Sequence, residues 1–160
     1  MGVVPPARKK IAGTIYVRDA FGAYVPEDGH PEPRLRIRKP KDCLPALLPY
    51  RAAKTECFMV VTLDASHTLV RVHEVTRGLV DRSLVHPREV FQKALEDMAA
   101  AIIVAHNHPS GSLDPSAEDL VSTRKLSQAA KVMGIPVLDH LIFAREGYSS
   151  IRERFPDYFT

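Results

Sequence analysis

The chain has 160 residues, 45% of them hydrophobic, which is enough for one complete hydrophobic core. It contains no apolar run of about 18 residues, the length of a membrane-spanning helix, and its N-terminus lacks the apolar segment of a secretory signal. We therefore expect a cytoplasmic protein that does not contact a membrane. The two cysteines, Cys43 and Cys57, are interpreted as reduced core thiols, with a disulfide or a metal role as the alternative.

The charged residues are distributed unevenly along the chain. Residues 1–55 contain 11 Lys or Arg and 5 Asp or Glu, a net charge of +6, whereas residues 56–160 contain 11 and 14, a net charge of −3. The basic stretch at residues 34–41 suits an anionic partner such as nucleic acid, but it also fits the solvated face of a strand. Both interpretations stay open, and the sequence does not indicate an oligomeric state.

The N-terminal part reads as an extension with its own local structure. Residues 11–25 alternate between apolar and polar side chains around a central turn, which predicts a β-hairpin. Residues 26–33 are rich in proline and glycine and predict a linker, and residues 35–39 alternate again as a possible edge strand. We expect residues 1–39 to form this basic extension and residues 40–160 to form the main domain.

The main domain is predicted to alternate between strands and helices. A proline-interrupted helix is expected over residues 40–50, a helix beginning at Pro87, and a helix capped by Ser116 and ended by Gly134. The expected strands are residues 57–63, 69–75, 101–105, 137–144 and 148–151. This alternation predicts an α/β fold, a mixed β-sheet flanked by helices.

Two histidines and an aspartate form the strongest chemical pattern. His106 and His108 follow a buried strand, and residues two apart in an extended chain point the same way. Asp119 falls in the first turn of the next helix, close enough in sequence to supply a carboxylate. Two nitrogens, one oxygen and an open position for water are typical of a catalytic zinc site. Non-haem iron uses the same ligand set and is the alternative, although nothing else in the sequence indicates an oxygenase.

These residues carry a resemblance to a known family. His106-x-His108-Pro109 followed by Ser116-x-x-Asp119 resembles the signature of JAMM/MPN metalloproteases, and residues 106–111 resemble its RadC-like version. Residues 84–91 and 138–140 match the RadC-like pattern as well, so the resemblance covers roughly residues 40–152. It implies a JAB/MPN domain of cytidine-deaminase-like architecture in which His106, His108 and Asp119 bind Zn²⁺.

The resemblance also implies two catalytic residues. The family's glutamate, which takes a proton from the zinc-activated water, stands at the start of a buried strand, where this sequence has Glu56; Glu74 in the partner strand is the alternative. Ser116 is implied as a hydrogen-bond donor to the developing oxyanion, and pure helix capping is its other interpretation. Two roles stay open for His140: a hydrogen-bond partner of a metal ligand, or a core histidine whose hydrogen bonds are satisfied without a metal.

We therefore expect a zinc-dependent hydrolase that acts on a peptide or isopeptide bond. The alternatives are a nuclease or DNA-repair-associated nucleic-acid-binding protein that uses the same metal site, and a non-catalytic binding module. Full-length RadC-like proteins carry an N-terminal helix-hairpin-helix region that residues 1–40 do not resemble, which weakens any DNA-related inference. The sequence lacks the Pro-Cys-x-x-Cys of zinc deaminases and the His-Glu-x-x-His of other metalloproteases.

Overall fold

The computed structural model describes residues 9–11, 14–18, 24–26, 35–78 and 85–160, and the chain divides into two units, residues 1–34 and 35–160. In the first unit β1 (Lys9–Ile11), β2 (Thr14–Arg18) and β3 (Tyr24–Pro26) form an antiparallel sheet in that order. β2 and β3 pair antiparallel in the stretch for which the sequence predicts a β-hairpin, and the predicted turn, residues 19–23, lies outside the described residues.

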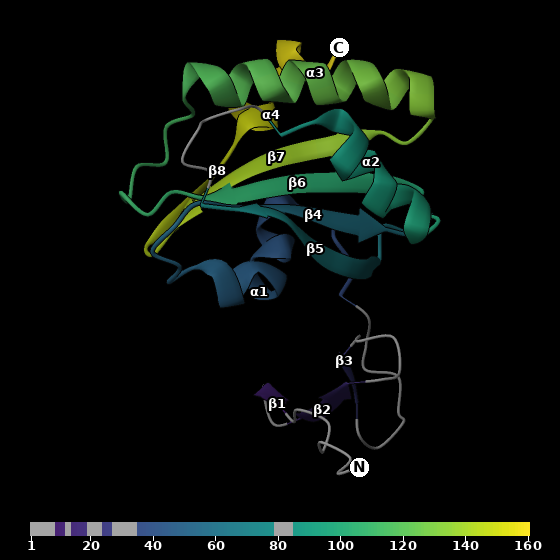
Figure 1. Ribbon diagram of the computed structural model, residues 1–160, viewed down its shortest axis with the longest axis vertical. Helices are drawn as coiled ribbons and strands as arrows, with labels where there is room; N and C mark the ends of the chain where they lie inside the picture. Colours follow the sequence, from purple (N-terminus) through teal and green to yellow (C-terminus); the bar gives the residue numbers. More distant parts are fainter. Residues whose placement is uncertain (1–8, 12–13, 19–23, 27–34, 79–84) are drawn as a thin grey trace. The chain divides into compact units, whose positions relative to one another are not determined.

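The second unit is built on a five-stranded mixed sheet with the strand order β5-β4-β6-β7-β8 (Figure 1). Only β6 and β7 run parallel; the other neighbouring pairs are antiparallel. The strands are β4 (Cys57–Leu63), β5 (Leu69–Arg77), β6 (Ala101–Asn107), β7 (Val137–Ala144) and β8 (Gly147–Ser150). This confirms the predicted α/β class with a mixed sheet flanked by helices.

Helices cover both faces of this sheet. The predicted helix at residues 40–50 consists of three short turns, and a proline occupies one of the first two positions of each. These turns are η1 (Pro40–Cys43), α1 (Leu44–Leu47) and η2 (Leu48–Tyr50). The opposite face carries α2 (Pro87–Glu96) and α3 (Ala117–Met133), while α4 (Ile151–Arg154) and η3 (Pro156–Phe159) end the chain (Figure 1).

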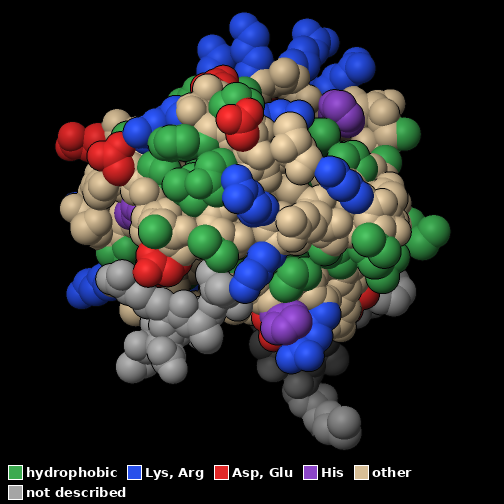
Figure 2. Space-filling model, turned by 90° about the horizontal axis from the view of Figure 1, so that it is seen from above, with side chains coloured by type: hydrophobic (Ala, Val, Ile, Leu, Met, Phe, Trp, Pro, Cys, Tyr) green, Lys and Arg blue, Asp and Glu red, His purple; other side chains and the backbone are tan. Residues whose placement is uncertain are grey.

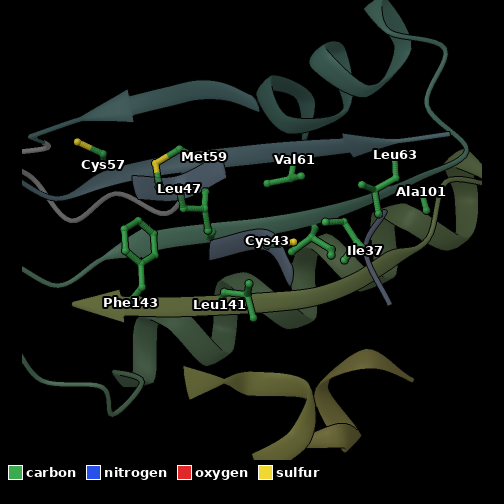
Figure 3. Close-up of a cluster of buried hydrophobic side chains, with 12 residues drawn as sticks. Ile37, Cys43, Leu47, Cys57, Met59, Val61, Leu63, Ala101, Leu141 and Phe143 are labelled. Atoms are coloured by element: carbon green, nitrogen blue, oxygen red, sulfur yellow. The ribbon is translucent and has the colours of Figure 1, made fainter. Parts of the chain in front are cut away.

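Alternation along the central strands divides the core into two layers. Met59, Val61 and Leu63 of β4 pack with Cys43 and Leu47 on the α1 side (Figure 3). The intervening residues of β4 pack against α2 and α3 on the other side. Because every residue of β4 and β6 is buried, both strands are apolar almost throughout, as expected for strands covered on both faces.

The structure differs from the sequence predictions at residues 35–39 and at the last strand, and both β5 and β6 run two residues further than predicted, to Arg77 and Asn107. Residues 35–39 do not form a strand: Arg36 makes a single antiparallel bridge to Thr68, and Ile37 is buried in the core of the second unit. The division between the units therefore falls after residue 34, whereas the sequence placed the boundary after residue 39. The last strand stops at Ser150, whose hydroxyl accepts from the Glu153 N–H and so begins α4 at Ile151.

Candidate metal centre

The two histidines of the motif lie at the carboxyl end of β6. His106 is the second-last residue of the strand and is buried, and His108 follows the strand with its N–H donating to the Phe143 carbonyl. Their Nε2 atoms are 2.9 Å apart, so both rings face the same point in space. The Nδ1 of His108 is 2.8 Å from the carbonyl oxygen of Ser112, to which it donates, and this leaves Nε2 as the lone-pair atom.

Asp119 is aimed at these histidines by the start of α3. The hydroxyl of Ser116, the N-cap residue, accepts from the Asp119 N–H at 3.1 Å, and Asp119 Oδ2 accepts from the Ser116 N–H at 2.7 Å. This reciprocal capping box restricts the carboxylate to one orientation. Its oxygens lie 3.3 Å from His106 Nε2 and 3.6 Å from His108 Nε2.

Glu56 reaches the same point from a different part of the fold. It precedes β4, its side chain is exposed, and a carboxylate oxygen lies within 4.8 Å of ligand atoms of His106, His108 and Asp119. Glu74, the alternative base, is not a member of this group; both its oxygens accept from Arg77, at 2.6 and 2.7 Å. The structure therefore brings together four residues that the sequence separates by up to 63 positions.

The donor atoms of His106, His108 and Asp119 fit a divalent metal ion. Their separations of 2.9, 3.3 and 3.6 Å bracket the roughly 3.3 Å between ligands of a tetrahedral zinc with bonds of about 2.0 Å. Burial opposes the ionisation of Asp119, but its interactions with His106 and His108, together with the hydrogen bond from the Ser116 N–H, outweigh burial and hold its pKa well below the usual range. The Asp119 carboxylate in turn raises the pKa of His108, because it favours the protonated form of that ring over the neutral form with its lone pair on Nε2. This mutual stabilisation indicates a site arranged for positive charge.

A buried histidine lies directly behind His106. His140 of β7 is fully buried, and its Nε2 is 2.8 Å from His106 Nδ1 while its Nδ1 is 2.7 Å from Thr123 Oγ1. Desolvation lowers the pKa of His140 well below the usual value, so the ring is neutral at physiological pH. Thr123 had no place in the sequence analysis, although its position four residues after Asp119 puts both on one face of a helix.

Asn107, the residue between the two histidines, points to the opposite face of the sheet. Its amide binds the segment that carries Glu56: Oδ1 accepts from the Cys57 N–H, and Nδ2 donates to the Thr55 carbonyl. The sequence analysis did not identify this contact. The available signal was the alternation of β6, which directs the side chain of residue 107 to the face opposite the candidate ligand His106.

Comparison with known proteins identifies relatives of the second unit. The family model of the RadC-like JAB domain matches residues 37–155. A UPF0758 protein of Picosynechococcus sp. is 48% identical over 99 residues, which cover 62% of this chain and 41% of the relative. UPF0758 proteins of Methanospirillum hungatei and Symbiobacterium thermophilum are 45% identical over 121 residues and 46% identical over 122 residues. These two alignments cover 74% and 76% of this chain and 54% and 52% of the relatives, so the chain spans about half the length of the curated relatives it matches.

Proposed function

The chain belongs to the RadC-like JAB domain family, and from this premise we propose that it is a zinc-dependent hydrolase of a peptide or isopeptide bond. One observation carries the proposal: ligand atoms of Glu56, His106, His108 and Asp119 all lie within 4.8 Å of one another. Three of these residues suit a metal ion, and the fourth is an exposed carboxylate beside it. An open coordination position next to a base is typical of a catalytic rather than a structural zinc site.

His106, His108 and Asp119 would hold the ion. When bound, zinc supplies a Lewis acid that polarises a carbonyl oxygen and lowers the pKa of a water molecule from about 16 towards 7. Since the ligands come from the end of β6 and the first turn of α3, they are held by rigid elements on both sides. Such preorganisation favours catalysis because little reorganisation is needed during the reaction.

Glu56 is proposed as the general base. Its carboxylate takes a proton from the attacking water and later delivers it to the leaving amine. Exposure of Glu56 suits this role, since the group must meet both water and substrate.

Ser116 is proposed to stabilise the oxyanion in addition to capping α3. Its oxygen accepts from the Asp119 N–H, so the hydroxyl proton is still available to a second partner. A well-aimed donor of this kind contributes about 3 kcal/mol to the stabilisation of the transition state. Both roles are therefore compatible with the same rotamer.

The edge of the sheet supports a peptide substrate. In the described part of the chain, β5 has β4 as its strand partner on one side only. On its other side, the described residues 35–37 bind only Leu69, the first residue of β5, and the turn that precedes it. The outer edge of β5 thus runs from Val70 to Arg77. Arg77 pairs with Cys57, the residue after Glu56, so this edge ends near the proposed base. An extended peptide that added to this edge would be led to the catalytic group.

Hydrolysis of a nucleic-acid phosphodiester is the second candidate, and it rests on the charge of the N-terminal third. Residues 1–55 carry the net charge of +6, and the pI is about 9.0. On the face of the molecule that carries α3, Lys and Arg side chains are interspersed with hydrophobic and acidic ones (Figure 2). At the site itself a bound divalent ion would offset the two carboxylates of Glu56 and Asp119, so the charge of the site does not separate the two candidates.

The two candidates are separated by one experiment. Zinc-loaded protein is incubated with a panel of peptides and isopeptide-linked conjugates and, in parallel, with single- and double-stranded DNA and RNA. We expect cleavage of an amide bond by the wild type and by Glu74→Gln, and its loss in Glu56→Gln. Cleavage of nucleic acid that depends on Glu56 would reject the peptidase and support the nuclease. No cleavage of any substrate would reject both enzymes and support a non-catalytic binding module.

A further inference from the structure

We propose that His140 is a positioning residue that sets the tautomer of His106, so that His106 Nε2 offers a lone pair to the metal ion. The inference rests on the metal site of the proposed function but not on its hydrolytic activity. It concerns a chain of hydrogen bonds that runs from the backbone of Asp119 through Thr123 and His140 to the ring of His106.

The direction of this chain is set at its first link. Thr123 Oγ1 lies 2.7 Å from the Asp119 carbonyl oxygen, which can only accept. The threonine hydroxyl therefore donates its single proton to that oxygen. The next contact, 2.7 Å between Thr123 Oγ1 and His140 Nδ1, therefore needs a proton from the histidine. His140 must carry its proton on Nδ1.

The hydrogen bond between His140 and His106 then fixes the tautomer of His106, the proposed metal ligand. The His140 ring is fully buried, and among the described residues its nitrogens contact only Thr123 and His106, with no carboxylate to balance a second proton. With its one proton on Nδ1, the ring has a lone pair on Nε2, which lies 2.8 Å from His106 Nδ1. His106 then donates from Nδ1, and its own lone pair is on Nε2, the atom that faces His108 and Asp119. The opposite tautomer of His106 would place a proton on Nε2 and block coordination.

Packing holds both rings in the orientation that this chain requires. The ring of Phe58 is stacked with His106 at 6.1 Å and meets the edge of His140 at 5.5 Å. Val104 and His140 are register partners on the parallel strands β6 and β7, which puts the His140 ring next to His106, two residues further along β6. Because His106 and His140 are almost completely buried, water does not compete for their nitrogens.

The tautomer is measured directly in the zinc-free wild-type protein, where no ion forces it. Long-range ¹H–¹⁵N NMR spectra of histidine-labelled protein should show His106 protonated on Nδ1 and His140 protonated on Nδ1. Protonation of His106 on Nε2 would overturn the proposal, and no variant is needed for this result.

The consequence for metal binding is measured by competition with a chelator. Thr123→Val removes the hydroxyl at nearly constant volume, and His140→Leu removes the acceptor; each should weaken zinc binding by about 10–100-fold, the usual effect of losing a partner of a metal-bound histidine. His140→Gln keeps an acceptor oxygen and should recover part of the affinity. Thr62→Val is the matched control, because Thr62 is also fully buried and hydrogen-bonded but binds Asp97 instead.

The outcomes separate this inference from the proposed function. Unchanged zinc affinity in Thr123→Val and His140→Leu would refute the inference even if the enzyme is active. Tight zinc binding that depends on Thr123 and His140, in a protein that cleaves no substrate, would support it and contradict the hydrolase. A wild-type protein that binds no zinc would refute both.

Discussion

Asn107 Oδ1 accepts a hydrogen bond from the backbone N–H of Cys57 at 2.7 Å, so the residue between the two site histidines also holds the start of β4. The same amide donates from Nδ2 to the carbonyls of Thr55 and Ala53, at 3.1 and 3.4 Å. One side chain thus binds the backbone on both sides of Glu56. The two faces of β6 serve different parts of the candidate site, the proposed ligand His106 on one and the segment that carries the proposed base Glu56 on the other.

Asn107→Ala should therefore loosen the segment that carries Glu56. The substitution leaves the Cys57 N–H and the Thr55 carbonyl without these partners, and we expect the free energy of unfolding to fall by about 1–3 kcal/mol. Urea denaturation measures the change, with Gln92→Ala as the control because its amide binds Glu96 on the exposed surface of α2. Equal stability of the Asn107 variant and the wild type would contradict the conclusion that the Asn107 amide holds the segment around Glu56.

The metal site predicts close to one zinc ion per chain in protein purified without chelator. His108→Ala should abolish zinc binding, since it removes one of three ligands, whereas His67→Ala, at an exposed turn, should retain the ion. Elemental analysis by mass spectrometry gives the stoichiometry. Finding no transition metal, and no uptake on titration with zinc, would reject the site.

Glu56 and Glu74 should respond differently to the same substitution. Glu56→Gln cannot accept a proton, so turnover of the cleaved substrate should fall by about 10²–10⁴-fold while the zinc content stays near the wild-type value. Glu74→Gln should retain activity, because Glu74 is paired with Arg77 and does not join the metal group. If Glu56→Gln instead loses zinc, Glu56 is a ligand and the coordination position assigned to water is occupied.

A buried carboxylate at the end of α2 predicts a pH dependence of stability. Burial raises the pKa of Asp97, but hydrogen bonds from Thr62 and His73 outweigh it, and the net effect is a lowered pKa. A depressed pKa in the folded state stabilises the protein above the unfolded value of about 3.9, and this contribution disappears as the pH falls through the folded value. Asp97→Asn should cost about 1–3 kcal/mol at pH 7 and progressively less below about pH 4. Urea denaturation at pH 7, 5 and 3 tests this; a constant difference would be inconsistent with the charge as its source.

Residues 1–34 should be dispensable for folding of the second unit. The strands β1 to β3 pair with one another, and the five-stranded sheet and its core lie within residues 35–160. A chain that begins at Leu35 should unfold cooperatively in a circular-dichroism melt and bind zinc like the full chain. The expectation fails if this shorter chain is unfolded.

None of the helices in the described part of the chain has the length and apolar character needed to cross a bilayer. Local patterns were sufficient for the main elements. The apolar run 57–63 and residues 137–144 form strands with the expected bounds, and α3 begins after Ser116 and ends before Gly134, where the backbone adopts φ +67°. Such features depend on residues within one or two turns of each other, so the sequence is enough to predict them.

Tertiary structure decided which residues support the candidate metal ligands. His140 reaches His106 only because β7 pairs in parallel with β6 in one particular register, and Asn107 reaches Cys57 across 50 residues because β4 lies beside β6. The sequence by itself determined the spacing of His106, His108 and Asp119, which is a local property of a strand, a loop and a capped helix. Strand order and register depend on the packing of the whole core, and no local pattern carries that information.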